Sequence, residues 1–223
     1  MLGRYERNLP ALTEADCALL REKKVAVIGC GGLGGYLIEL LTRVGVGAIR
    51  AVDGDSFEES NLNRQLLATL DTLGCSKAEA AAVRARTIDP SIHVTALPVF
   101  LTRDNALELL EGCDVVLDAL DSVESRRILS DACAELGIPL IYGAISGWVA
   151  QAGVSMPGDG LIGALFPAHV ELRDRSALSF TPALCAAIQT SLCVKLLVGR
   201  PVQTGTVFYF DLLNQEFESI SLV

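Results

Sequence analysis

The feature that most constrains this chain is a strand–turn–helix–strand unit near its N-terminus. The apolar run Val25–Ile28 predicts a buried strand, and a glycine turn in the pattern G-x-G-x-x-G follows it. Apolar residues at helical spacing from Leu37 to Val44 predict a helix, and the next apolar run, Ala48–Val52, ends at Asp53. The turn residues are Gly29, Gly31, Gly32 and Gly34. Such a turn lets the backbone approach a phosphate at a helix N-terminus, and a carboxylate after the second strand suits a ribose, so the unit predicts nucleotide binding.

A polar cluster follows the ribose carboxylate, and an oxidoreductase needs no such cluster at this place. It consists of Asp55, Asn61, Arg64, Gln65 and Lys77. The donors Asn61, Arg64 and Lys77 gather in one predicted loop-and-helix zone of an acidic protein, which favours a protein that handles the phosphates of ATP. Lys77 lies near a predicted helix N-terminus, where a cation is unfavourable unless an anion is present. The residues leave open whether Asp55 is structural or belongs to the site. No G-K-[ST] sequence follows the glycines, so the turn is not a P-loop.

The combination resembles the ThiF/MoeB/HesA family, relatives of the ubiquitin-activating enzymes, over nearly the whole chain. The resemblance implies that Asp53 binds the ribose hydroxyls and that Asn61, Arg64 and Lys77 contact the triphosphate of ATP. It also implies that Asp121, in the segment DALDS, holds Mg²⁺, a cation that needs only one or two protein carboxylates. The family often has Asn after this aspartate, whereas Ser122 stands here.

The N-terminal motif Arg4-Tyr5-Glu6-Arg7 carries a further implication of the resemblance. In family members the second arginine of this motif enters the ATP site of the neighbouring subunit. Arg7 is therefore expected to act across the interface of a homodimer, which two-fold symmetry allows reciprocally. The alternative is a surface arginine on a frayed terminus.

The activity that the resemblance implies is ATP- and Mg²⁺-dependent adenylation of the C-terminal carboxylate of a small ubiquitin-like sulfur-carrier protein. Such carriers serve the synthesis of thiamine or molybdopterin-type cofactors, and the sequence does not choose among these pathways. One alternative is adenylation of another carboxylate, such as one linked to tRNA. Others are an NAD-dependent Rossmann oxidoreductase and a non-catalytic nucleotide-binding partner. The net charge of −9 weighs against tRNA, and the polar cluster disfavours the other two.

The order of apolar runs predicts the fold. Strands alternate with helices as far as Tyr142, which predicts a doubly wound, Rossmann-like α/β fold with a mostly parallel sheet. Later strands lack crossover helices and predict an antiparallel C-terminal extension. We expect a single adenylation domain over 1–223: an N-terminal arm at 1–24, a nucleotide-binding half at 25–143 and a carrier-binding half at 144–223, with a mobile loop at about 157–181.

Cysteine usage and charge limit the cofactors and partners. The seven cysteines form no C-x-x-C, so the zinc site of many family members is expected to be absent. Cys185 and Cys193 fall in an apolar helical pattern and are expected to be buried, so we expect no thioester with the carrier. The acidic balance argues against nucleic acid or a membrane as partner, and the absence of a leader-like segment predicts a cytoplasmic protein.

Overall fold

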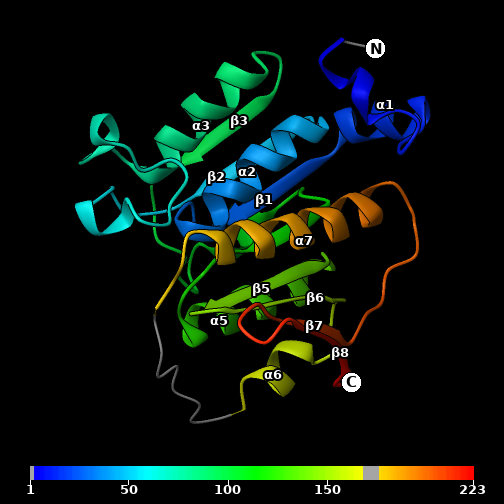
Figure 1. Cartoon of the computed structure of the whole chain (residues 1–223). Coiled ribbons are helices and arrows are strands. Elements are labelled where there is room, and N and C mark those ends of the chain that lie inside the picture. The colour runs from blue at the N-terminus through cyan, green and yellow to red at the C-terminus, as the bar shows by residue number, and fades with distance from the viewer. Residues whose placement is uncertain (1–2, 168–175) are drawn as a thin grey trace.

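The computed structural model describes residues 3–167 and 176–223, and its centre is one sheet in the strand order β3-β2-β1-β4-β5-β6-β7-β8. Neighbouring strands from β3 to β5 run parallel, whereas those from β5 to β8 run antiparallel. The strands are β1 (Lys24–Ile28), β2 (Ala48–Val52), β3 (His93–Leu97), β4 (Val115–Asp118), β5 (Leu140–Ser146), β6 (Val149–Ser155), β7 (Thr206–Asp211) and β8 (Glu216–Ser221). The predicted parallel sheet with an antiparallel C-terminal extension is confirmed (Figure 1).

Helices cover both faces of the sheet, because side chains on a strand point alternately to its two sides. Val25 and Val27 of β1 join a core with α1, α2, α3 and α7, whereas Ala26 and Ile28 join a second core with α4, α5 and α6. The helices are α1 (Glu14–Glu22), α2 (Gly32–Val44), α3 (Lys77–Ile88), α4 (Ala106–Leu110), α5 (Val123–Leu136), α6 (Leu161–Leu165) and α7 (Phe180–Leu197), with short 3-10 turns η1 (Gly3–Asn8), η2 (Glu59–Asn61) and η3 (Leu70–Thr72).

The position of β1 creates the crevice in which the site lies. The chain leaves β1 through α2 towards β2 on one side, and returns through α4 to β4 on the other side of β1. Ligands of open α/β sheets bind at such a switch point, outside the carboxyl ends of the strands. The carboxyl ends of β1, β2 and β4 are Ile28, Val52 and Asp118.

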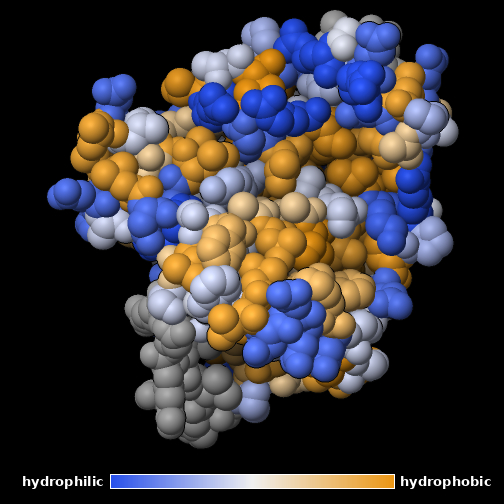
Figure 2. Space-filling model, in the orientation of Figure 1, coloured by the Kyte–Doolittle hydropathy of each residue, from blue (hydrophilic) through white to orange (hydrophobic). Residues whose placement is uncertain are grey.

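The longest helix, α7, packs beside α2 on the face that Figure 1 presents to the viewer. In the described residues it is the one helix long and apolar enough to cross a bilayer, but half of it is buried in this fold, as in the core helix of a soluble protein. Buried Gln189 of α7 donates to the carbonyls of Asp118 (2.8 Å) and Ile141 (3.2 Å), which ties the helix to β4 and β5. Figure 2 shows apolar side chains gathered along the outer side of this helix.

Local hydrogen bonds decide where the later helices begin. Helix α5 begins at Val123, because the Ser122 hydroxyl caps it by accepting from the Ser125 N–H at 3.0 Å. The loop expected at about 157–181 contains the short helix α6, whose Leu161 and Ile162 are buried. It also contains the first residues of α7. Residues 168–175 of the expected mobile loop lie outside the described residues.

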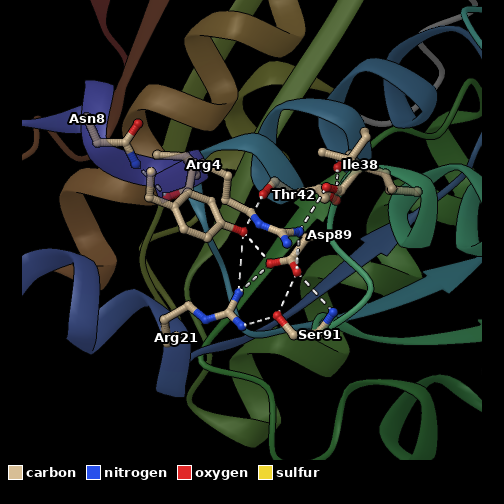
Figure 3. Close-up of polar contacts among 10 residues, drawn as sticks. Arg4, Asn8, Arg21, Ile38, Thr42, Asp89 and Ser91 are labelled. Carbon is tan, nitrogen blue, oxygen red and sulfur yellow. Dashed lines mark hydrogen bonds and ion pairs between the residues drawn. The ribbon is translucent and has the colours of Figure 1, made fainter. Parts of the chain in front are cut away.

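The N-terminal arm is anchored by one buried carboxylate, Asp89, at the end of α3 (Figure 3). Its oxygens accept from Arg4 at 2.8 Å, from Arg21 at 2.8 Å and from the Tyr5 hydroxyl at 2.5 Å. Burial alone would raise the pKa of Asp89, but hydrogen bonds from Ser91, Tyr5 and Arg21 outweigh it and hold this pKa well below its usual range. Burial and the bond to Asp89 raise the pKa of Tyr5 to about 12. The arm therefore packs on the ends of α2 and α3 through a charged anchor.

Candidate active site

A cleft of about 1080 Å³ opens at the carboxyl ends of the parallel strands. Most of the residues predicted for the site line it: Gly29, Gly31, Gly32, Asp53, Asp55, Asn61, Arg64, Gln65, Lys77 and Asp121. Gly34 lies one helical turn behind the cleft, and Arg7 does not reach it. The fold thus brings together segments that are up to 92 residues apart in the sequence, from Gly29 to Asp121.

The glycine turn packs so closely on neighbouring backbone that Gly29 and Gly34 leave no room for a side chain. Gly29 has φ +97°, and a Cβ there would lie 2.5 Å from the carbonyl oxygen of Ala119. A Cβ at Gly34 would lie 1.8 Å from the carbonyl oxygen of Gly29, so the start of α2 packs directly against the turn. Gly31 is the N-cap of α2 and provides no side-chain cap, so the first N–H groups of the helix remain available to an anion.

The Asp53 carboxylate holds this turn in place through hydrogen bonds with backbone N–H groups. Its Oδ2 accepts from the Cys30 N–H at 2.7 Å, and its Oδ1 accepts from the Asp55 N–H at 2.8 Å. A carboxylate has about four lone-pair positions, so two backbone bonds leave room for two further donors such as ribose hydroxyls. The carboxylate lines the cleft, and its predicted contact with a ribose stays a prediction.

Lys77 and Asp55 form an ion pair in the cleft, with 3.2 Å between Nζ and Oδ2. Lys77 is the first residue of α3, and its side chain is only 10% exposed, whereas that of Asp55 is 55% exposed. A cation at a helix N-terminus is opposed by the helix dipole, and Asp55 offsets that repulsion. Asp55 therefore has a structural function in the site, which is to hold the Lys77 ammonium group at the cleft.

The segment around η2 supplies three more polar side chains. Asn61 is buried and its Oδ1 accepts from the Glu58 N–H at 3.1 Å, so much of its bonding capacity holds its own turn. Arg64 is half-buried and uses Nη1 to donate to the Ser60 carbonyl at 2.9 Å, which leaves other guanidinium N–H groups available. The Oε1 of buried Gln65 has no hydrogen-bond partner among the described residues. An orphaned buried acceptor that lines a cleft indicates a site whose ligand or water completes its bonding.

Two aspartates follow β4 and they have different surroundings. Asp118 is fully buried, with an oxygen 3.2 Å from the Nε of Arg126. Burial raises the pKa of Asp118, although the neighbouring Arg126 opposes this shift. Asp121 is exposed and lines the cleft. Of the two aspartates, Asp121 is the one that lines the cleft, and its predicted contact with Mg²⁺ stays a prediction.

Arg126 is a buried cation of the site region that the sequence did not single out. Its guanidinium donates to the carbonyls of Leu120 and Gly143, the latter at 3.0 Å. Its Cζ lies 5.3 Å from the ring centre of Tyr142 and 5.4 Å from that of Phe166. Arg126 therefore joins the loop that carries Asp121 to β5 and to the end of α6. No spacing in the sequence marks this arginine, because its partners include a backbone carbonyl and ring faces that are distant along the chain.

The donors present suit a magnesium nucleotide. Within residues 3–167 and 176–223 no group of three or more His, Cys, Asp or Glu side chains could hold a metal ion. Mg²⁺ requires no such group, because it keeps several waters and binds through one or two carboxylates plus substrate phosphates. Asp121 supplies such a carboxylate at the cleft, which the glycine turn, Arg64 and Lys77 also line.

The two cysteines of α7 are poor nucleophiles. Cys185 and Cys193 are buried as predicted. Burial raises the pKa of Cys185 to about 12, although hydrogen bonds with backbone carbonyls oppose the shift. A nucleophilic thiolate is scarce at neutral pH for such a group. Cys75, two residues before Lys77, is exposed.

Arg7 lies far from the cleft of its own chain. It is exposed on η1, and the neighbouring Asn8 donates to the Val44 carbonyl at the C-terminal end of α2. The cleft is at the other end of this helix, about 20 Å away for its 13 residues. An ATP-site function for Arg7 therefore requires a second copy of the chain and stays a prediction.

Comparison with known proteins identifies the family. Residues 5–222 match the ThiF family. The chain belongs to the ThiF family. One of its curated relatives is a SAMP-activating enzyme E1 from Haloferax volcanii, which is 34% identical over 98% of this chain and 84% of that protein. Another is a sulfur carrier protein adenylyltransferase from Thermus thermophilus, which is 32% identical over 99% of this chain and 87% of that protein.

Solved structures agree with this ThiF-family fold. E. coli tRNA N6-threonylcarbamoyladenosine dehydratase superposes with a TM-score of 0.75 at 26% identity, over 88% of this chain and 94% of that one. E. coli MccB, solved with MccA-N7isoASN, gives a TM-score of 0.85 at 19% identity, over 99% and 71% of the chains. At 19% identity, the likeness to MccB shows a shared fold and nothing further.

Proposed function

We propose that this ThiF-family protein uses ATP and Mg²⁺ to adenylate the C-terminal carboxylate of a small ubiquitin-like sulfur-carrier protein. The observation that carries the proposal is the meeting of the glycine turn, Arg64, Lys77 and Asp121 in one cleft. The curated relatives support it, because those from Haloferax volcanii and Thermus thermophilus are named for activating SAMP and for adenylating a sulfur carrier protein.

The reaction requires positioning and charge stabilisation rather than a general base. A C-terminal carboxylate is ionised at pH 7, so its oxygen can attack the α-phosphorus of ATP directly. The new P–O bond forms as the bond to pyrophosphate breaks, and the product is an acyl-adenylate. Arg64, Lys77 and the N–H groups at the start of α2 would hold phosphate oxygens as negative charge develops on them. Bound Mg²⁺, held by Asp121 and the phosphates, would offset charge on the leaving pyrophosphate.

The proposal includes a homodimer in which Arg7 enters the neighbouring site. It is supported by the anchored but exposed position of Arg7 and by the apolar side chains along α7 in Figure 2. The proposal also includes no thioester step, because Cys185 is buried with a raised pKa.

Nucleotide binding and exchange together test the proposal. Calorimetry with ATP and Mg²⁺ should give a saturable binding isotherm, and NAD should give none. Radioactive pyrophosphate should enter ATP only when a sulfur carrier with a free C-terminal carboxylate is supplied. Binding of NAD without ATP would indicate an oxidoreductase. Exchange supported by a carboxylate-bearing tRNA but by no carrier protein would indicate the activity of the E. coli dehydratase instead.

A further inference from the structure

An exposed aromatic ring stands in the cleft with no function in the phosphate chemistry. Phe100 follows β3, lines the cleft and is 62% exposed. Two other aromatic residues line the cleft, Tyr142 and Phe166, and both are buried, with ring centres 5.9 Å apart in an edge-to-face pair. Large apolar side chains exposed in a concave site indicate a ligand that covers them. We propose that Phe100 is the platform on which the base of the bound nucleotide stacks, an inference that rests on the proposed function.

The ring of Phe100 lies directly on the backbone of Gly54. A Cβ at Gly54 would be 2.6 Å from Cδ2 and 2.7 Å from Cε2 of this ring, closer than real Cβ contacts. Gly54 immediately follows Asp53, the carboxylate suited to a ribose. With phosphates at the glycine turn and the ribose at Asp53, the base extends beyond β2 towards the loop after β3, and Phe100 is the aromatic residue of that loop.

The loop is fixed before any ligand binds. The side chain of Asn105 donates to the Phe100 carbonyl at 2.9 Å and accepts from the Thr102 N–H at 2.8 Å. The neighbouring apolar side chains of Val99 and Leu101 also line the cleft. A loop whose backbone is already held by such bonds loses little conformational entropy on binding, so stacking on its aromatic ring adds directly to nucleotide affinity.

The proposal separates base contacts from phosphate contacts, and calorimetry on the full chain tests the separation. The ligands are ATP and inorganic tripolyphosphate, each with Mg²⁺. Phe100→Ala should weaken ATP binding about fivefold or more, the loss expected for one stacked base, and leave the Kd for tripolyphosphate unchanged. Phe100→Trp should retain ATP affinity, because its ring also offers a stacking face.

Gly54→Ala provides an independent route to the same effect. The backbone of Gly54 is outside the left-handed region, so alanine is allowed there, but its Cβ would displace the ring. The variant should weaken ATP binding as Phe100→Ala does. The double variant should bind ATP no more weakly than Phe100→Ala alone, because neighbours that act through one contact are not additive.

Matched controls and contrary outcomes complete the test. Phe217→Ala removes a phenylalanine that is 63% exposed on β8, and Gly163→Ala adds a Cβ with nothing within 4 Å; both should bind ATP normally. ATP binding by Phe100→Ala at the wild-type Kd would overturn the inference. So would an equal loss for tripolyphosphate, which would indicate a structural effect. A wild-type protein that binds no ATP would overturn the proposed function itself, and this inference with it.

Discussion

Lys77 is the residue whose charge we expect the reaction to depend on most. It is a buried cation that lines the cleft, paired with Asp55 across 3.2 Å at the start of α3. Lys77→Ala should lower carrier-dependent ATP–pyrophosphate exchange by about a hundredfold or more, the usual loss when one fixed donor to a developing charge is removed. Lys23→Ala is the matched control and should exchange normally, because the ion pair of Lys23 with Asp114 lies at the amino ends of β1 and β4 and outside the cleft. Wild-type exchange by Lys77→Ala would remove this residue from the site.

The cysteines give a second prediction at this scale. The pKa of Cys185 is raised to about 12, so this thiol should resist alkylation at neutral and mildly alkaline pH in the folded protein, whereas exposed Cys75 should react. Cys185→Ser should yield as much carrier-adenylate as the wild type, and mass spectrometry should find no thiol-labile enzyme–carrier adduct. An adduct that disappears in Cys185→Ser would show that this residue becomes accessible and forms a thioester.

The grouping of the candidate site residues was predictable from the sequence where a motif fixes both spacing and chemistry. Ten predicted residues, from Gly29 to Asp121, line one cleft because the strand–turn–helix pattern determines where strand ends meet. Arg126 and Phe100 were missed, since an arginine in a helix and a phenylalanine in a loop have no special spacing. Their positions follow only from contacts with Gly143 and Gly54 across the fold.

At the scale of the elements, the contribution of the N-terminal arm to stability can be tested at its buried carboxylate, Asp89. A carboxylate with a lowered folded pKa contributes stability above its unfolded pKa, near 3.9, and loses it as pH falls towards the folded value. Wild-type stability should therefore decrease as pH falls below about 4. Asn cannot be ionised, so Asp89→Asn should cost about 3 kcal/mol at pH 7, and the difference should shrink in acid.

Chemical denaturation at several pH values measures this effect. Asp71→Asn, at an exposed aspartate in η3, is the control and should be close to neutral at every pH. An Asp89→Asn variant that is as stable as the wild type at pH 7 would contradict the anchor. A difference that grows in acid would contradict its electrostatic origin.

Element boundaries were harder to predict than the elements themselves. Strong apolar periodicity marked β1 and α2, whereas α6 is one turn long and its apolar residues follow a glycine-rich stretch that reads as loop. The side chain of Asp159 stabilises the start of α6, because it accepts a hydrogen bond from the Leu161 N–H at 2.9 Å. Single hydrogen bonds of this kind decide where short helices begin, and they leave little periodic signal.

At the scale of the whole molecule, the account predicts a dimer with shared sites. Arg7→Ala and Asp121→Ala should each be nearly inactive alone. After mixing and subunit exchange, half of the dimers are hybrids with one complete site, so roughly a quarter of wild-type activity should return. Native mass spectrometry of the mixture should be used to check that hybrid dimers have formed. A mixture that stays inactive although hybrids are present, or full activity of Arg7→Ala alone, would contradict a contribution across the interface.

The central claim is that the cleft transfers AMP to a carrier carboxylate, and the mass of the carrier tests it most directly. The enzyme is mixed with ATP, Mg²⁺ and a sulfur carrier, and the intact carrier is weighed before any sulfur donor is added. The account predicts a carrier heavier by one adenylyl group, formed in proportion to the pyrophosphate released. A carrier with an amidated C-terminus, which lacks the attacking oxygen anion, should gain nothing. Adenylylation of the amidated carrier, or pyrophosphate release without any gain in carrier mass, would contradict the account.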